Sequence, residues 1–534
     1  MVKLANFIFR SSLALVAIFA VVTMARAEPT EVNNFDELKD AINNAKTEIV
    51  IKNDIDFTAN VPEINYNNIV ISGPSENAQG LLNGNGNYKF FMFGVKAKNI
   101  SLKNLHLSDG NNKDESSISN GGGAIHLGKE VVVNLEGLTF SNNQTISRGG
   151  AIHSRGTDND NKNNLNFTGE TTFSGNKTVQ ILGNGGAIYA ENSSLTFGKL
   201  LATFENNSSK NNGGAIYGGN GTELTFGGDV TFTENSSDGN GGAIHFWGEN
   251  ATNKNILEFE GNATFVRNST TKDGNGYGGA IYIWDSSLTF GGLATLESNR
   301  AKFGGAICAR MNTSIKFNNG LRLIGNTTGN KNSGALHILG SSNDELAIIT
   351  IIQRNPAVPT EFRGNKSGDG EHNAVYMTQY SRLNFFVEKG SVNIFDVFSG
   401  KKDGPDNIIT INEGDGWINI EKGGSLENVR VVSGGNLKLA GESRGFNLID
   451  FTNSGTIRFE ILPGKINAKI NADSITLKQG TVLEIVAVKG QLYQTGESYD
   501  ILAIDGKKNN KTINGQENSK LISLQRDLKI EGGL

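Results

Sequence analysis

The sequence predicts an all-β protein, a right-handed single-stranded parallel β-helix with three strands per coil and a short N-terminal capping helix. Three observations predict this fold. Gly (68) and Asn (69) make up about a quarter of the 534 residues, and both types disfavour helix interiors and suit tight turns. A Gly-Gly-Ala-Ile tetrapeptide recurs about every 31 residues. The segments between its copies alternate with period two, as strands do.

Residues 1–27 are predicted to be a signal peptide. Lys3 and Arg10 give a positive start, residues 13–22 are apolar, and Ala25-Arg26-Ala27 fits a small-x-small cleavage site. An uncleaved signal anchor is the alternative. The mature chain is expected to begin at Glu28.

The composition of the mature chain argues against some classes of partner and some means of stabilisation. Loss of Lys3, Arg10 and Arg26 lowers the net charge from −5 to −8, and this acidic balance argues against a nucleic-acid partner. With Cys308 as its single cysteine, the chain cannot be held by intrachain disulfides. No other apolar segment is long enough for a transmembrane helix.

Residues 28–119 are predicted to form the N-terminal cap and the first coils. Asn34 can cap a helix whose apolar side chains share one face; these are Phe35, Leu38, Ala41 and Ile42. A helix there would cover the open end of the stack. Strands are expected within residues 49–55, 69–72, 90–93 and 100–107.

Residues 120–380 carry two interleaved tetrapeptides. The intact Gly-Gly-Ala-Ile copies are Gly122, Gly123, Ala124, Ile125; Gly149, Gly150, Ala151, Ile152; Gly185, Gly186, Ala187, Ile188; Gly213, Gly214, Ala215, Ile216; Gly241, Gly242, Ala243, Ile244; Gly278, Gly279, Ala280, Ile281; and Gly304, Gly305, Ala306, Ile307. The intact Phe-x-x-Asn copies are Phe140, Asn143; Phe173, Asn176; Phe204, Asn207; Phe232, Asn235; Phe265, Asn268; and Phe362, Asn365. Stacked coils would align each position with its counterpart about 4.8 Å away. Gly pairs then permit a tight corner, Ala, Ile and Phe fill the interior, and Asn amides can stack in a ladder.

Every third coil of this region is enlarged. The long intervals begin at Ala151, Ala243 and Ala335, which are 92 residues apart. The extra residues fall after the Gly-Gly-Ala-Ile strand, at 156–164, 248–255 and 340–346. We predict three loops in a row along one edge, roughly 14 Å apart, where a binding surface is first to be sought. Block duplication with tolerated insertions is the alternative.

Residues 381–505 are predicted to continue as degenerate coils. Alternation persists within residues 392–397, 408–411, 418–420, 457–461, 475–477 and 483–488. Residues 506–534 are rich in Lys and Asn, which predicts a polar tail or linker.

One column combines most of the histidines with tyrosines. It lies two places after the motif Ala and holds His126, His153, His245, His337, Tyr189, Tyr217, Tyr282, Tyr376 and Cys308. Adjacent rungs bring His126 and His153 close enough to share a metal. No carboxylate or second Cys recurs beside them, so a ring-stacking ladder is favoured. Asp238 and Asp273 could belong to calcium turns, but the spaced Asp nonapeptide of calcium-binding rolls is missing. We expect no metal and no cofactor.

Catalysis on this fold would need two or three carboxylates converging on one outer face. The exposed column within the apolar-x-Phe triplets supplies no such cluster; it reads Asn166, Thr196, Thr225, Glu258, Thr289 and Lys316. We therefore expect a protein that is not an enzyme, with no catalytic residue. A polysaccharide lyase or hydrolase is the alternative to a binding protein, and a structural envelope protein is a third.

The interleaved motifs resemble those of the passenger region of chlamydial polymorphic membrane proteins and related autotransporter adhesins. The resemblance covers residues 120–380, and residues 470–505, with Leu477-Lys-Gln-Gly and Tyr499-Asp-Ile-Leu, are similar to the end of such passengers. It implies a rod that is secreted or displayed on a Gram-negative outer membrane. It also implies that the two tetrapeptides serve adhesion to a host-cell protein or glycan. Family members end in a translocating β-barrel, and the sequence up to Leu534 has no such run of strands.

Overall fold

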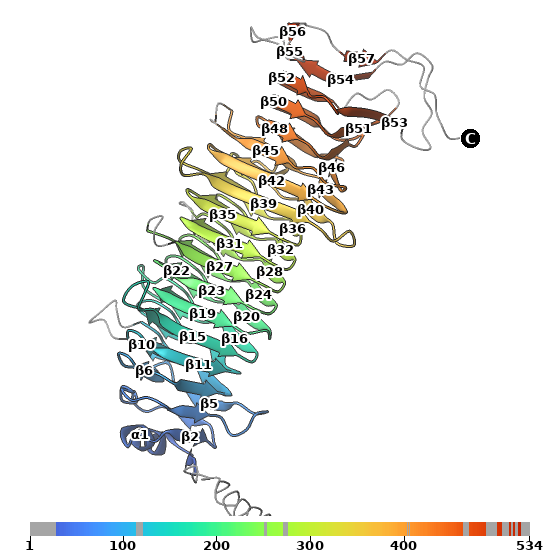
Figure 1. The fold of residues 1–534 in the computed structure, drawn as a ribbon. Coiled ribbons are helices and arrows are strands. Elements are labelled where there is room, and N and C mark those ends of the chain that lie inside the picture. Colours follow the sequence, from blue (N-terminus) through green and yellow to red (C-terminus); the bar gives the residue numbers. More distant parts are fainter. Residues whose placement is uncertain are drawn as a thin grey trace, which may run out of the picture.

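The chain winds into a long parallel β-helix with its N-terminal end at the bottom of Figure 1 and its C-terminal end at the top. This computed structural model describes residues 28–113, 121–249, 254–270, 276–402, 404, 406–462, 469–487, 499–504, 512–513, 516–517 and 522–524. The predicted signal peptide lies outside the described residues. The strands fall into columns, and each column stacks the equivalent strands of successive coils.

The first two columns hold the Gly-Gly-Ala-Ile strands and the strands that end in the apolar-x-Phe triplets. The first column comprises β6 (Phe91–Phe93), β10 (Ile125–Leu127), β14 (Ile152–Arg155), β18 (Ile188–Glu191), β22 (Ile216–Gly219), β26 (Ile244–Trp247), β30 (Ile281–Trp284), β34 (Ile307–Arg310), β38 (Leu336–Leu339), β41 (Asn373–Met377), β44 (Val397–Gly400) and β47 (Ser425–Glu427). The second comprises β1 (Thr30–Val32), β2 (Glu48–Ile51), β4 (Val70–Ser72), β7 (Ile100–Lys103), β11 (Val132–Glu136), β15 (Asn163–Thr168), β19 (Ser193–Phe197), β23 (Glu223–Phe226), β27 (Asn255–Phe259), β31 (Ser286–Phe290), β35 (Thr313–Phe317), β39 (Ala347–Gln353), β42 (Ser381–Val387), β45 (Ile408–Ile411) and β48 (Arg430–Ser433).

The third column holds the Phe-x-x-Asn strands, and a fourth follows the Asn. The third comprises β3 (Ile55–Asp56), β5 (Gly80–Asn83), β8 (Leu105–Ser108), β12 (Thr139–Ser141), β16 (Thr171–Ser174), β20 (Ala202–Glu205), β24 (Val230–Thr233), β28 (Ala263–Val266), β32 (Ala294–Glu297), β36 (Leu321–Ile324), β40 (Thr360–Arg363), β43 (Ser391–Ile394), β46 (Trp417–Ile420), β49 (Asn436–Leu439), β51 (Thr456–Ile461) and β53 (Val482–Ala487). The fourth comprises the two-residue strands β9 (Asn111–Asn112), β13 (Gln144–Thr145), β17 (Lys177–Thr178), β21 (Ser208–Ser209), β25 (Ser236–Ser237), β29 (Ser269–Thr270), β33 (Arg300–Ala301) and β37 (Thr327–Thr328). This short fourth strand adds to the three that the sequence predicts.

Near the C-terminal end the first two columns merge. β50 (Gly445–Asn453) pairs with both β47 and β48, so the corner between the two strands of a coil straightens there. β52 (Ile470–Leu477) and β54 (Tyr499–Ile504) continue this column. Short strands follow, namely β55 (Thr512–Ile513), β56 (Gln516–Glu517) and β57 (Ile522–Leu524).

The repeat register confirms the β-helix prediction. The amide of Ala187 donates to the carbonyl of Ala215, and the amide of Ala215 donates to that of Ala243, both at 2.9 Å. Ile188 likewise pairs with Ile216, and Ile216 with Ile244. Identical motif positions are therefore nearest neighbours in adjacent coils.

The core consists of stacked side-chain columns. Phe140, Phe173, Phe204, Phe232 and Phe265 stack with ring centroids 4.7 to 4.8 Å apart. A second stack, from β15 to β35, meets the first edge to face; it contains Phe167, Phe197, Phe226, Phe259, Phe290 and Phe317. Stacking along each column and edge-to-face contact between columns are both favourable geometries for aromatic rings.

A ladder of buried asparagines runs beside the Phe columns. Its members are Asn143, Asn176, Asn207, Asn235, Asn268, Asn299, Asn326 and Asn365. From Asn176 onward, each side-chain oxygen accepts hydrogen bonds from the backbone amide and side-chain amide of the asparagine one coil earlier. The Asn143 oxygen accepts from the backbone amide of Gly110 at 2.8 Å. Each side-chain amide also donates to a backbone carbonyl, as Asn176 does to Phe140. The ladder thus satisfies buried polar groups in every coil, which would otherwise be costly.

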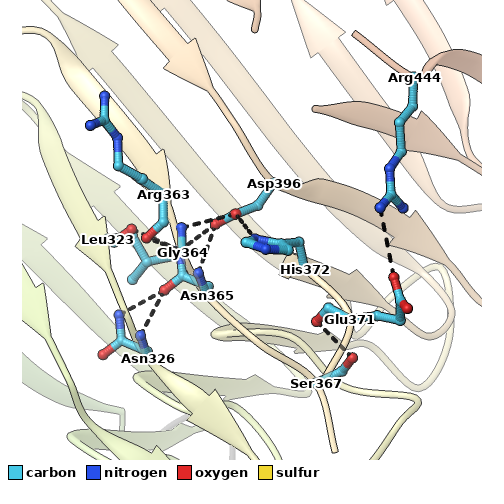
Figure 2. Close-up of polar contacts among 10 residues, drawn as sticks. All are labelled: Leu323, Asn326, Arg363, Gly364, Asn365, Ser367, Glu371, His372, Asp396 and Arg444. Atoms are coloured by element: carbon cyan, nitrogen blue, oxygen red, sulfur yellow. Dashed lines mark hydrogen bonds and ion pairs between the residues drawn. The ribbon is translucent and has the colours of Figure 1, made fainter. Parts of the chain in front are cut away.

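Asp396 ends this ladder (Figure 2). Its carboxylate has no exposed surface and accepts from the amides of Gly364 and Asn365 and from the Asn365 side chain, at 2.8 to 2.9 Å. His372 Nδ1 lies 2.9 Å from the same carboxylate. A carboxylate suits this position because it accepts from four donors and need not pass a donor onward.

A helix covers the N-terminal end of the stack, as the sequence predicts. Helix α1 (Phe35–Asn43) is capped by Asn34, whose side chain accepts from the amide of Glu37 at 3.0 Å. Its buried face is the predicted one, made of Phe35, Leu38, Ala41 and Ile42. Among the described residues, no helix is long and apolar enough to cross a membrane.

Candidate functional site

The repeated tetrapeptides lie inside the rod. The Gly, Ala and Ile residues of all seven copies are buried, and so are the Phe and Asn residues of the six intact Phe-x-x-Asn copies. Their neighbours are the same motif residues one coil away. These residues shape the rod from its interior.

The His and Tyr column forms a stacked ladder. His126, His153, Tyr189, Tyr217 and His245 stack in that order with ring centroids 5.0 to 5.1 Å apart and nearly parallel planes. Stacked rings direct their nitrogen lone pairs along parallel lines and not towards one point, so the geometry favours the ladder over a shared metal.

Burial keeps these histidines neutral. It lowers the pKa of His126 to about 4, that of His245 to about 3 and that of His337 to about 4. Burial, with nearby positive charges, also holds the pKa of His153 well below its usual value. Burial raises the pKa of the Cys308 thiol, in the same column, to about 12. His126 is partly exposed, and His153, His245, His337 and Cys308 are buried.

The enlarged corners lie in one row. Seven residues separate the first-column strand from the second-column strand at 156–162, 248–254 and 340–346, whereas Asn192 alone does so in the coil after the first loop. The three loops follow β14, β26 and β38, which are three coils apart in one column. Residues 250–253 of the second loop lie outside the described part of the chain.

Not all of the extra residues fall at this corner. Nine residues, 179–187, separate β17 from β18, where six residues, 210–215, separate β21 from β22. The expectation of a single enlarged corner therefore needs correction. The lengthened turn at 179–187 exposes apolar side chains, including Ile181, which is 73% exposed.

The first enlarged loop borders an open polar pocket of about 440 Å³, which we call the corner pocket. It is lined by Lys98, Glu130, Val132, Asn159, Asp160, Asn161, Lys162, Asn164, Ser194 and Glu223. Val132, Asn164, Ser194 and Glu223 share one register position in β11, β15, β19 and β23, and they form its floor. The loop provides one wall. A pocket of this size is large enough for a small ligand.

Contacts with later coils hold the loop in place. Lys162 Nζ lies 2.7 Å from Glu223 Oε1, two coils onward, and the Lys162 side chain is only 15% exposed. The side-chain oxygen of Asn159 lies so close to Gly221 that a Cβ there would be 1.6 Å from it. Within the loop, Asp158 accepts from the amides of Asp160 and Asn161, and the Asn161 hydrogen bond lowers the pKa of the Asp158 carboxyl. The loop is therefore a preformed wall.

A buried polar network supports the strand that precedes the pocket. Glu191, 9% exposed, pairs with Arg155 at 2.9 Å and accepts from the Tyr189 hydroxyl at 2.8 Å. Arg148 donates to that hydroxyl at 2.9 Å, and the Asn220 side chain donates to Glu191 at 3.2 Å. This network fixes the corner from which the loop leaves.

Two of the three carboxylates that line the corner pocket are engaged in ion pairs. Glu223 pairs with Lys162 at 2.7 Å, and Glu130 lies 3.8 Å from Lys96. The lining therefore offers charged and amide groups that can form hydrogen bonds with a ligand.

Sequence reasoning located the loop but missed its floor. The floor residues each lie one position before an apolar-x-Phe triplet, as Asn164 lies before Leu165-Asn166-Phe167. Alternate residues of a strand point to the same side, so the pattern that places Asn166 on the outer face also places Asn164 there. That signal was present in the sequence. The ion pair between Lys162 and Glu223 spans 61 residues, and no local pattern indicates it.

Comparisons with known proteins agree with this architecture. Residues 29–147 match the family model of a putative pectate lyase-like adhesive domain. Residues 170–191, 202–219 and 229–246 match the Chlamydia polymorphic membrane protein repeat. Comparison with curated proteins gave no match, and comparison with solved structures gave none. The matches confirm the resemblance to passenger regions of polymorphic-membrane-protein-like autotransporters.

Proposed function

We propose, from this likeness and the geometry of the corner pocket, that the chain is an adhesin-like binding rod, secreted or displayed at a Gram-negative outer membrane. In this proposal, residues 1–27 direct export, the coils act as a rigid spacer, and the outer surface binds a host-cell protein or glycan. The protein acts by binding and not by catalysis. The observation that carries the proposal is a preformed polar pocket at the corner where loops recur every third coil.

The motif residues support adhesion indirectly in this proposal. Because they are buried, they set the spacing and direction of the surface loops without contacting the partner. Recurring loops on a rigid rod allow several weak contacts to act together, which raises overall affinity if the partner surface matches their spacing.

Trimming the first loop tests the proposal. Replacement of residues 156–162 by a single Asn would copy the corner of the next coil, where Asn192 alone joins β18 to β19. We expect the trimmed protein to keep its circular dichroism spectrum and to lose most of its binding to cultured host cells, measured by flow cytometry with fluorescently labelled protein.

A point substitution at the pocket is Lys98→Ala, because Lys98 lines it. Its matched control is Thr196→Ala, at an exposed position of β19 that does not line the pocket. Lys98→Ala should weaken cell binding, and Thr196→Ala should leave it unchanged. Equal binding by the trimmed and unmodified proteins would refute a role for the corner pocket. Absence of binding to any host cell type by the unmodified protein would refute the adhesin function itself.

A further inference from the structure

A second surface feature lies in the degenerate coils. A groove of about 440 Å³ crosses the outer face of strands β42, β45, β48, β50 and β52, the consecutive strands in the upper part of Figure 1. We call it the C-terminal groove. It is lined by Phe386, Thr410, Ile411, Asn412, Glu413, Val432, Ser433, Gly434, Thr452, Ser454 and Lys478. Its lining begins at Phe386, after the last lining residue of the corner pocket, Glu223, and the two sites share no residue.

Two outward-facing columns form the groove. Thr410, Val432 and Thr452 share one register position in successive coils. The second column lies two residues further along the chain in each coil and contains Asn412, Gly434 and Ser454. Their backbone amides donate to carbonyls of the neighbouring strand, namely those of Phe385, Ile411 and Ser433 respectively. The groove therefore runs along the rod axis, with new side chains every rung, about 4.8 Å apart.

Gly434 makes the hollow in this surface. It stands between Asn412 and Ser454. The nearest atoms to a Cβ built on it are in the Glu413 and Ser454 side chains, at 3.3 and 3.7 Å, followed by the Glu413 backbone nitrogen at 3.8 Å. Its backbone is not in the left-handed region. The backbone conformation at this position therefore does not require glycine. Because Gly434 has no side chain, the space above it remains open and forms part of the groove.

The lining combines apolar faces with neutral hydrogen-bonding groups. Phe386 is 38% exposed and Val432 is 42% exposed. The positions equivalent to Val432 in the coils before it are polar, as at Thr410, Asn384 and Thr350. Hydroxyls and an amide surround Phe386 and Val432. One acidic and one basic side chain, Glu413 and Lys478, leave the lining without net charge.

The side chains and paired backbone of the groove limit the classes of ligand that it can bind. The backbone groups of the groove strands are already paired in the parallel ladder, so a peptide cannot add as a further strand. A nucleic acid would need a cluster of basic side chains. An uncharged saccharide chain presents apolar ring faces and hydroxyl edges at repeating intervals, which matches an aromatic face beside hydroxyl and amide groups.

We propose that the C-terminal groove binds an uncharged oligosaccharide chain lying along the rod axis, with Phe386 contacting a sugar ring. The site is independent of the corner pocket and goes beyond the proposed adhesion to cells. It binds without bond cleavage.

Gly434→Leu tests the groove by filling it. The full-length protein would be titrated by isothermal calorimetry with neutral hexasaccharides of the cello-, xylo-, malto-, manno- and chito-series, and with hexagalacturonate and a heparin hexasaccharide as charged comparisons. We expect at least one neutral series to bind, Gly434→Leu to abolish that binding, and Phe386→Ala to weaken it by about tenfold.

Thr196→Leu is the matched control, because it adds the same side chain to an exposed position of β19 outside the groove; it should leave saccharide binding unchanged. Should Gly434→Leu fail to fold, Phe386→Ala alone decides, since Phe386 is an exposed side chain. Binding of charged saccharides only, binding that neither substitution weakens, or no binding in any series would each overturn the proposal. The loop-trimmed protein separates the two sites: it should keep saccharide binding even where it loses cell binding.

Discussion

At the scale of single residues, Asp396 decides how the asparagine ladder ends. Each asparagine both accepts from the coil before and donates, so a chain of asparagines needs a last acceptor. Asp396 provides it from the following coil, where it meets the amides of Gly364 and Asn365. The sequence motif ends at Asn365, and nothing in the residues around Asp396 repeats the motif. Sequence reasoning therefore missed this residue.

Asp396→Asn should destabilise the coils on both sides of it. An Asn side chain has one oxygen and one donor group, so in either orientation its donor group faces donors that Asp396 now satisfies (Figure 2). Leaving buried donors unsatisfied costs about 1 to 3 kcal/mol each. Thermal unfolding followed by circular dichroism should detect the loss. Asp415→Asn, on an exposed turn, is the control and should leave the midpoint unchanged; an unchanged midpoint for Asp396→Asn would contradict the assigned role.

The buried histidines make stability depend on pH. Their folded pKa values lie below the unfolded value near 6.5, so between pH 6.5 and about 4 the unfolded chain binds protons that the folded chain does not. The free energy of unfolding should therefore fall as the pH falls through this window, by up to about 1.4 kcal/mol per pH unit for each histidine.

His153→Phe should reduce this pH dependence. Within the described residues, neither ring nitrogen of His153 has a hydrogen-bond partner, and its neighbours in the stack are the rings of His126 and Tyr189. A phenyl ring keeps the stacking and removes the proton-binding group. Unfolding midpoints at pH 7.5 and 5.5 should lie closer together in the variant than in the unmodified protein. Equal pH dependence in both would show that His153 is not buried in a neutral form.

At the scale of elements, glycines set the corners of each coil. Gly213 has a φ of +68°, a conformation that side chains disfavour. Gly214 is required for a different reason: a Cβ there would lie 2.0 Å from the carbonyl oxygen of Gly242 in the next coil. The pair therefore combines a left-handed turn with the closest approach of two coils. The sequence predicted the tight corner, but not which glycine serves which purpose.

Gly214→Ala should be strongly destabilising. The added methyl group would press on the backbone of the next coil, which cannot move without breaking its own ladder, and overpacking of this kind costs about 1 to 3 kcal/mol or more. Gly198→Ala is the control, because a Cβ at Gly198 meets its nearest atom at 3.4 Å. Urea unfolding should separate the two variants. A similar loss for both would contradict the close-approach argument.

The remaining elements were predicted unevenly. Helix α1 was predicted with its cap and its buried face, because both depend on local spacing. Strands β47 to β50 were not predicted, because their coils lack both tetrapeptide motifs. The alternation of their apolar residues alone does not distinguish them from other short strands. Strand β5 was also not predicted. It runs from Gly80 through two leucines to Asn83, and its position is set by pairing with β8 and not by a pattern in its own sequence.

At the scale of the whole molecule, each coil contacts mainly the coils before and after it. Stability then depends on interfaces between neighbours, so a local defect should remain local. Cys308 provides a probe for this property. It is buried, and burial raises its pKa to about 12, so it should react with a thiol reagent only when its coil opens.

Labelling of Cys308 should therefore depend on where a defect lies. Ala280 is buried at the corner before β30, and its backbone amide donates to the carbonyl of Ala306 in the coil of Cys308 at 2.9 Å. Ala280→Asp would place a charge in this buried coil. It should increase the rate at which Ellman's reagent labels Cys308. Ile418→Asp, in the distant strand β46, should leave the labelling rate near that of the unmodified protein. Equal acceleration by both would show that the rod opens as one cooperative unit.

The sequence by itself determined the parallel β-helix, the register of its coils, the N-terminal helix and the row of enlarged corners, because each depends on a period that repeats along the chain. Only the tertiary structure decided the corner pocket, the C-terminal groove and the role of Asp396. Their residues meet across coils, from positions 20 to 60 or more residues apart, through contacts such as that of Lys162 with Glu223. A repeat predicts which positions stack, whereas the shape of the surface depends on the side chains that break the repeat.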